Sequence, residues 1–216
     1  MPRAKKQIYV ISRRSRKIIF ILCLALLIYL VRLDHGSSFL RIAPPPNSKA
    51  DQLSYDIQKY DAKSFTVVNV VDGDTIDIDI PDIKYETTRI RLLGVDTPET
   101  KNPKTGPMYF GRQASEFTKE LTLGKKITVF LDKNGNTRGK YGRLLAYVKL
   151  PDGSFLNEVL LKEGYAYADL RFRHSLYQKY SQLESLARNS KAGLWKEVTK
   201  AQLPYWLNER KPNLIK

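Results

Sequence analysis

Three carboxylates and two arginines stand in short segments whose residue types suit chemistry on a phosphodiester. The carboxylates are Asp74, Asp96 and Glu99, and the arginines are Arg91 and Arg143. Hydrolysis of a phosphodiester adds negative charge to an anionic centre, so a site needs a cation, a group that positions or deprotonates water, and fixed positive donors. Aspartate oxygens suit Ca²⁺ or Mg²⁺, and the arginine fork donates two bonds to phosphate. These residues predict one metal-assisted hydrolytic site.

The predicted strands bring the carboxylates together. Two strands, at residues 66–71 and 75–80, are joined by an Asp-Gly pair, which is a strong hairpin signal. A third strand, at residues 90–95, ends shortly before Pro98, which cannot continue it. One carboxylate begins the second strand, and the other two follow the end of the third. Because neighbouring antiparallel strands bring such ends close to each other, we expect the three carboxylates to meet.

Several linked motifs resemble the staphylococcal nuclease (thermonuclease) family. They are DGDT at 72–75, RLLGVDTPET at 91–100 and YGR at 141–143, and they occur in the family's order. The resemblance covers about residues 64–195. It implies an α+β fold, with an OB-fold five-stranded β-barrel and three helices, preceded here by an N-terminal apolar helix.

The resemblance also implies an activity and a role for each site residue. It implies a calcium-dependent nuclease that acts on DNA and RNA and leaves 3′-phosphate ends. The residues that match the family's calcium ligands are Asp74, Asp96 and Thr97, the last through its backbone carbonyl. The residues that match the catalytic groups are Glu99, which positions or activates water, and Arg91 and Arg143, which grip the phosphate. We expect a monomer that takes single-stranded or frayed DNA and RNA.

The sequence departs from the family pattern in two places. Gly139 stands where the family often has an acidic residue. By spacing, Leu170 and Phe172 fall where the family's base-stacking tyrosines would be expected, although Tyr165 and Tyr167 lie nearby. The departure concerns the stacking of bases and leaves the hydrolytic centre intact.

The N-terminus resembles a membrane anchor. The net charge is +15, and residues 1–33 hold eight Lys or Arg and no acid, so about half of the excess lies there. An unbroken apolar run follows at 18–31; it is shorter than the ~20 residues of a typical spanning helix. No clean cleavage site follows it, so we favour an uncleaved signal anchor over a cleaved signal peptide. The basic end would stay in the cytoplasm and the remainder outside the cell membrane; secretion after cleavage is the alternative.

The rest of the chain divides into three parts. Residues 34–63 form a spacer that contains three consecutive prolines, residues 64–196 form the nuclease-like domain, and residues 197–216 form a tail that we expect to be loosely docked. The three helices expected in the domain lie at 108–123, 157–163 and 175–190. The single cysteine, Cys23, excludes an intramolecular disulfide.

Simpler explanations exist for each site residue taken alone. Asp74 could cap a turn, and Arg91 could pair with an outward acid such as Asp79. His35 and His174 are too few and too far apart in the sequence for a catalytic cluster. Two other classes also compete: a non-catalytic, membrane-tethered OB module that binds nucleic acid, and an interaction protein that uses the tail and spacer. All the expected site residues are present in order, which favours the nuclease.

Overall fold

The computed structural model describes residues 48–83, 85–101 and 106–215. Of the N-terminal part it describes only five helical residues, Arg14, Lys17, Ile19, Phe20 and Leu22. Apart from these five residues, the predicted anchor lies outside the described residues, as do residues 34–47 of the predicted spacer. Within the part that is described, no helix is both long and apolar enough to cross a membrane. The chain divides into two units, 1–44 and 45–216, and the barrel and the candidate site belong to the second.

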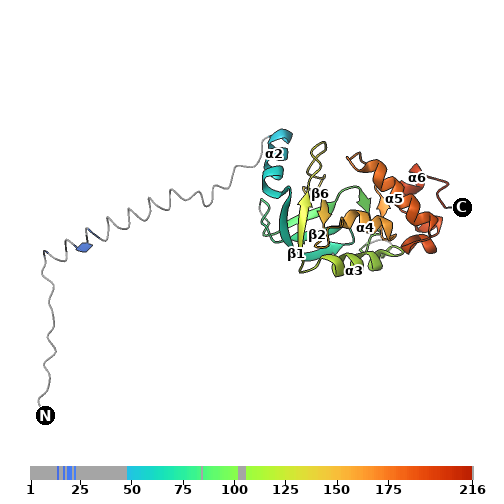
Figure 1. Cartoon of the computed structure of the whole chain (residues 1–216), viewed down its shortest axis with the longest axis horizontal. Helices are drawn as coiled ribbons and strands as arrows, with labels where there is room; N and C mark the ends of the chain where they lie inside the picture. The colour runs from blue at the N-terminus through green and yellow to red at the C-terminus, as the bar shows by residue number, and fades with distance from the viewer. Residues whose placement is uncertain are drawn as a thin grey trace, which may run out of the picture. The chain divides into compact units, whose positions relative to one another are not determined.

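Five strands close into a barrel, as the OB-fold prediction requires (Figure 1). The strands are β1 (Lys63–Asp72), β2 (Thr75–Ile78), β3 (Thr88–Leu92), β5 (Lys126–Phe130) and β6 (Leu144–Lys149). Their order around the barrel is β1-β2-β3-β6-β5, and all pairs are antiparallel except β3 with β6. The fold class is therefore the predicted α+β barrel.

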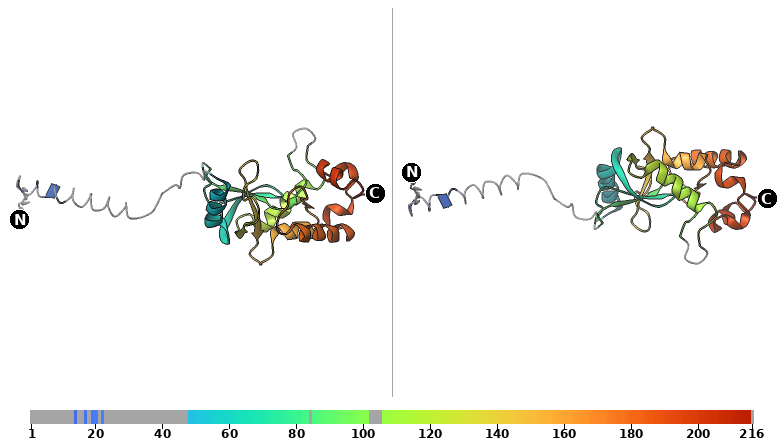
Figure 2. Two further views of the ribbon diagram at one scale, coloured as in Figure 1. Left: turned by 90° about the horizontal axis from the view of Figure 1, so that it is seen from above. Right: turned by 90° about the horizontal axis from the view of Figure 1, so that it is seen from below.

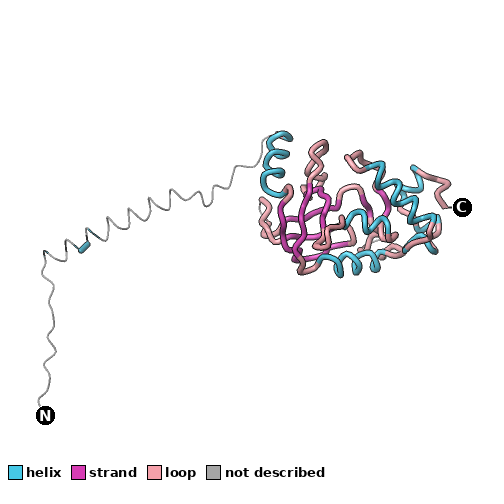
Figure 3. Tube along the Cα trace, viewed as in Figure 1, coloured by secondary structure: helices cyan, strands magenta, loops and turns pink. Residues whose placement is uncertain are grey.

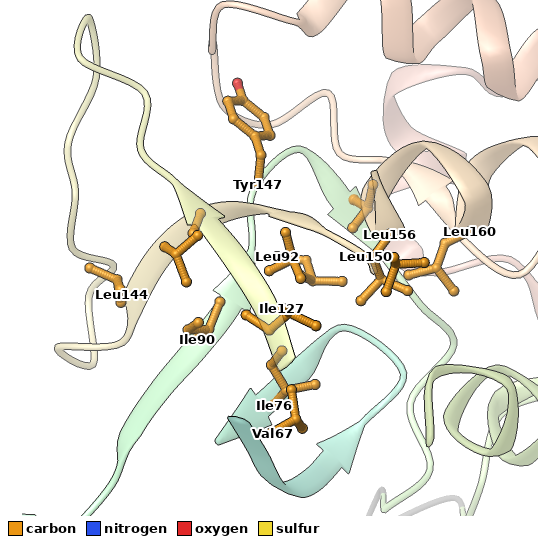
Figure 4. Packing of buried hydrophobic residues seen from close by; sticks show 14 of the residues in the cluster. Val67, Ile76, Ile90, Leu92, Ile127, Leu144, Tyr147, Leu150, Leu156 and Leu160 are labelled. Atoms are coloured by element: carbon orange, nitrogen blue, oxygen red, sulfur yellow. The ribbon is translucent and has the colours of Figure 1, made fainter. Parts of the chain in front are cut away.

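Alternating apolar side chains fill the barrel because successive residues of a strand point to opposite faces. Figure 4 shows this core, in which Ile76, Ile90 and Ile127 from three strands are almost fully buried. Leu156 and Leu160 of α4 (Leu156–Lys162) join the same cluster. Burial of apolar surface on this scale is the main source of stability in a domain of this size.

Three helices cover the barrel within residues 64–196 of the described chain, which confirms the prediction. They are α3 (Gly111–Thr122), α4 and α5 (Tyr177–Asn189). The helix α3 lies beside β1, and α5 packs on α4. In Figure 3 the strands gather next to α2 (Lys49–Tyr60), and helices dominate the opposite end of the domain.

A short two-stranded sheet links the barrel to α5. It pairs β4 (Val95–Asp96) with β7 (Tyr167–Ala168). The buried carboxylate of Glu184 on α5 accepts a hydrogen bond from the Ala168 backbone N–H at 2.8 Å. The strand that carries Asp96 is thus tied to α5 through its neighbour.

The described part of this segment, residues 197–215, is docked, so the expectation of a loosely docked tail is wrong. It contains η2 (Lys200–Gln202) and α6 (Tyr205–Arg210), which lie with α5 at the end of the domain farthest from α2 (Lys49–Tyr60) in both views of Figure 2. It completes a second apolar cluster made of Tyr167, Ala187, Leu194, Trp195, Val198, Leu203 and Leu207. The apolar residues of the tail are too few to form a recognisable helical repeat, so the sequence pattern did not predict this docking.

We expect replacement of Leu207 by Ala to lower the free energy of unfolding by about 2–5 kcal/mol, since the side chain is fully buried. Chemical denaturation measures this difference. The neighbouring Tyr205 is 77% exposed, so Tyr205→Ala should change stability by no more than about 0.5 kcal/mol. Equal effects of the two substitutions would contradict the docking of α6.

Candidate active site

The turn between β1 and β2 places Asp74 against the segment that follows β4. Asp74 Oδ2 accepts a hydrogen bond from the Thr97 backbone N–H at 2.9 Å, and Oδ1 accepts one from the Thr75 hydroxyl at 2.9 Å. Gly73 makes the approach possible, because a Cβ there would come within 2.8 Å of Thr97 Oγ1. The Asp-Gly-Asp sequence therefore serves both the turn and the close packing of two site segments.

Arg91 joins two of the predicted carboxylates. Its Nη1 lies 2.9 Å from Asp74 Oδ2, and its Nη2 donates to Asp96 Oδ1 at 2.5 Å. Nη1 also donates to the Val95 carbonyl at 2.6 Å, which ties β3 to β4. Burial, together with the charge of Asp74, raises the pKa of Asp96, although Arg91 opposes the shift. Arg91 thus pairs with Asp74 and Asp96 and not with the alternative partner Asp79, whose Oδ1 accepts from the Thr66 backbone N–H.

Glu99 stands at the open edge of the same cluster. Partial burial of its carboxyl, a hydrogen bond with Asp72 and the nearby charges of Asp74 and Asp96 raise the pKa of Glu99 to about 7. The hairpin alone explains Asp72 as a turn residue, yet it also faces Glu99 and accepts from the Thr100 backbone N–H at 3.4 Å. Four carboxylates therefore converge here, where the sequence predicted three.

The carboxylate oxygens of the cluster are of the kind that hard divalent cations prefer. Asp74 and Asp96 both contact one positive group, the Arg91 guanidinium, so their oxygens face a common region. The crowding of like charges around Glu99 is also what a bound cation would relieve. Across the described residues, no group of three or more His, Cys, Asp or Glu side chains is arranged as a metal site. The expected site needs only two carboxylates and the Thr97 carbonyl, and the calcium roles of these residues stay predictions.

Arg143 lies beside Arg91 at a pocket of about 400 Å³ that both residues line. Its Nε is buried, and no atom of the described residues hydrogen-bonds to it. Burial and the adjacent charge of Arg91 lower the pKa of Arg143 from its usual high value. A half-buried guanidinium with an unsatisfied donor, next to a second guanidinium, suits an anionic ligand.

Exposed aromatic rings border the same pocket. Tyr141 is 76% exposed and Phe172 is 65% exposed. Tyr167 is fully buried, and Tyr165 stacks on Phe117 with ring centroids 4.0 Å apart, so neither offers a free face to a base. Leu170 packs against the barrel core. The structure therefore leaves Tyr141 and Phe172 as the rings of this pocket that a base could reach.

The sequence motifs do not predict two of the contacts that Asp96 makes. Trp206 Nε1 donates to Asp96 Oδ2 at 2.8 Å, and an Arg171 Nη2 atom lies 3.0 Å from Asp96 Oδ1. Trp206 is 110 positions away in the sequence, and nothing local to either residue signals the contact. Arg171 lies between the two expected stacking positions, Leu170 and Phe172, and its positive charge is the one local signal for its contact with a carboxylate.

His174 supports the turn that precedes β4. It packs against Gly94, whose φ is +76°, and a Cβ on Gly94 would come within 2.4 Å of His174 Nε2. His174 Nδ1 hydrogen-bonds with the Tyr147 hydroxyl at 3.0 Å. Burial lowers the pKa of His174, although the charges of Asp132 and Asp169 oppose the shift. This histidine therefore has a packing role beside the site.

The comparisons with known proteins agree with this geometry. The staphylococcal nuclease homologue family matches residues 89–197. A thermonuclease from Staphylococcus hyicus is 39% identical over 134 residues, which cover 62% of this chain and 76% of that protein. A thermonuclease from Staphylococcus intermedius is 38% identical over 144 residues, or 67% of this chain and 76% of its own length.

The chain belongs to the staphylococcal nuclease family. A further relative, the endonuclease YncB of Bacillus subtilis, is 48% identical over 101 residues, which cover 47% of this chain and 46% of that protein. These relatives support a nuclease function. The family match begins before Arg91 and ends at residue 197, so α2 and α6 lie outside it.

The shift at His174 has a consequence for stability. The folded-state pKa lies below the unfolded value of about 6.5, so the unfolded state takes up the proton first. The contribution of His174 to the stability of the folded state is therefore fully present above pH 6.5 and decreases as the pH falls below that value. We expect the wild-type protein to lose unfolding free energy relative to His174→Phe when the pH is lowered from 8 to 5. Denaturation at each pH measures this difference. A wild-type protein that gains stability relative to the variant at low pH would contradict the assignment.

Proposed function

We propose that the chain is a calcium-dependent nuclease that hydrolyses phosphodiester bonds of single-stranded or frayed DNA and RNA. The observation that carries the proposal is the buried, unsatisfied Nε of Arg143 beside Arg91, next to a cluster of carboxylates. The arginines supply fixed donors for a phosphate, and the carboxylates supply oxygen ligands and a proton acceptor. The family membership and the named activities of its relatives support the same reaction.

In the proposed reaction each site residue has a separate role. A water molecule attacks the phosphorus and the bond to the 5′ oxygen breaks, which leaves a 3′-phosphate and a 5′-hydroxyl. Glu99 accepts a proton from the attacking water, and the 5′ oxygen gains one from solvent. Arg91 and Arg143 donate hydrogen bonds to the phosphate oxygens as their charge grows. Asp74, Asp96 and the Thr97 carbonyl would hold calcium, which would supply positive charge beside the phosphate.

The proposed place of action is the outer face of the cell membrane. Support comes from the sequence alone: basic residues precede the apolar run at 18–31, and such an order leaves the basic end in the cytoplasm. Calcium is abundant outside cells, where weak oxygen sites can fill. The nuclease domain would then meet nucleic acid outside the cell.

Substitution of Glu99 by Gln tests the reaction. The amide keeps the shape of the carboxyl but cannot accept the proton, so we expect the rate to fall by about 10²–10⁴-fold. Cleavage of single-stranded DNA by the full chain is measured with Ca²⁺, with Mg²⁺ and with a chelator. Binding of DNA without cleavage by the wild-type protein in every condition would support the non-catalytic OB module instead.

Substitution of Arg143 by Lys tests the phosphate fork. We choose Arg143 rather than Arg91 because Arg91 holds a buried ion pair, whose disruption would destabilise the fold by about 3–5 kcal/mol. Lysine keeps the charge but loses the planar fork, so we expect cleavage to slow by about 10²–10³-fold. Arg112→Lys, on an exposed position of α3, is the matched control. A rate equal to that of the control would remove Arg143 from the proposed chemistry.

A further inference from the structure

The side chain of Asp96 is held from three directions. Arg91 and Arg171 both contact its Oδ1, and the indole N–H of Trp206 donates to its Oδ2. The guanidinium of Arg171 lies over the Trp206 ring, 4.7 Å from its centroid. Arg171 also forms a bidentate pair with Asp169 at 2.8 and 2.9 Å. These contacts fix the plane of the Asp96 carboxylate.

Buried contacts hold Trp206 in place. The next residue, Leu207, is fully buried in the second apolar cluster. Lys211, just past α6, lies 3.3 Å from Glu184 Oε1, and the other oxygen of Glu184 accepts from the Ala168 backbone. Ala168 belongs to β7, which pairs with the strand that carries Asp96. The tail contacts α5, and Asp96 lies on the strand that pairs with β7, so the tail and Asp96 are linked through α5 and β7.

We propose that Trp206 is a positioning residue for Asp96 and that the segment 197–216 completes the active site. The inference rests on the proposed function, in which Asp96 is a calcium ligand. Trp206 lies beyond the family match at 89–197, so this support belongs to the chain's own C-terminal segment. Hydrogen bonds from outside the ligand set orient metal-binding carboxylates in this way.

The indole of Trp206 is suited to orient the Asp96 carboxylate and not to compete with a cation for it. Trp206 is a neutral donor that takes one lone pair of Oδ2, and a carboxylate oxygen has a second one available to a cation. A positive side chain in the same place would compete with a cation directly. The indole therefore orients the ligand and adds no charge at the metal side.

Substitution of Trp206 by Phe tests the proposal in the full chain. Phe keeps an apolar aromatic ring on α6, although a smaller one, and removes the N–H donor. We expect calcium affinity, measured by isothermal titration calorimetry, to fall by about 10–100-fold, and the calcium concentration for half-maximal DNA cleavage to rise in parallel. The KM for DNA at saturating calcium should stay unchanged. Tyr205→Phe is the matched control, since Tyr205 is the adjacent aromatic residue and is largely exposed; it should behave as wild type.

Equal calcium affinity in Trp206→Phe and the wild type would overturn the proposal. Tighter binding in the variant would also overturn it, because the tail would then compete with the cation. Absence of both calcium binding and cleavage in the wild type would refute the proposed function itself, which keeps the two failures distinguishable.

A second measurement applies even where Trp206→Phe does not fold. The chain has two tryptophans, Trp195 and Trp206, so Trp195→Phe leaves Trp206 as the only indole emitter. We expect calcium to change its fluorescence, because the carboxylate that accepts the indole N–H would also bind the ion. Emission that stays constant while calorimetry shows calcium binding would overturn the proposal.

Discussion

The contact of one guanidinium with two aspartates holds the candidate site together. Arg91 on β3 reaches Asp74 in the turn before β2 and Asp96 on β4. Without it, two carboxylates would face each other in a largely buried place, where repulsion and desolvation both act against the charged forms. The same arginine is proposed to meet the phosphate. Structure and chemistry at this position therefore cannot be separated by a single substitution.

Segments outside the family match support the site from both ends of the domain. At one end, Arg138 pairs with the buried Asp56 of α2 and donates to the carbonyl of Gly142 at 3.0 Å. Gly142 immediately precedes Arg143, so α2 helps to fix the loop that carries this arginine. At the other end, Trp206 holds Asp96. Each supporting contact ends on a site residue or on its neighbour in the chain.

Local signals in the sequence predicted the barrel and the convergence of the site residues. The Asp-Gly hairpin, the period-two strands and the order of the motifs place Asp74, Asp96 and Arg91 together, and the structure does the same. The Trp206 contact lies beyond such signals, because it depends on how α6 docks on α5 and not on any pattern near Asp96. The sequence neighbours of Asp72 explain it fully as a turn residue; its proximity to Glu99 follows only from the fold.

With a cation and a phosphate bound as proposed, the charges of the site would make each ligand favour the binding of the other. The carboxylates of Asp72, Asp74, Asp96 and Glu99 crowd one edge, and Arg91 and Arg143 line the adjoining pocket. A phosphate on the arginines would meet repulsion from the carboxylates at a distance where screening by solvent is incomplete. A cation held by the carboxylates would remove that repulsion, and the phosphate would in turn offer the cation further oxygens. Because such linkage is reciprocal, each proposed ligand would raise the affinity for the other, and the orientation of Asp96 would bear on both.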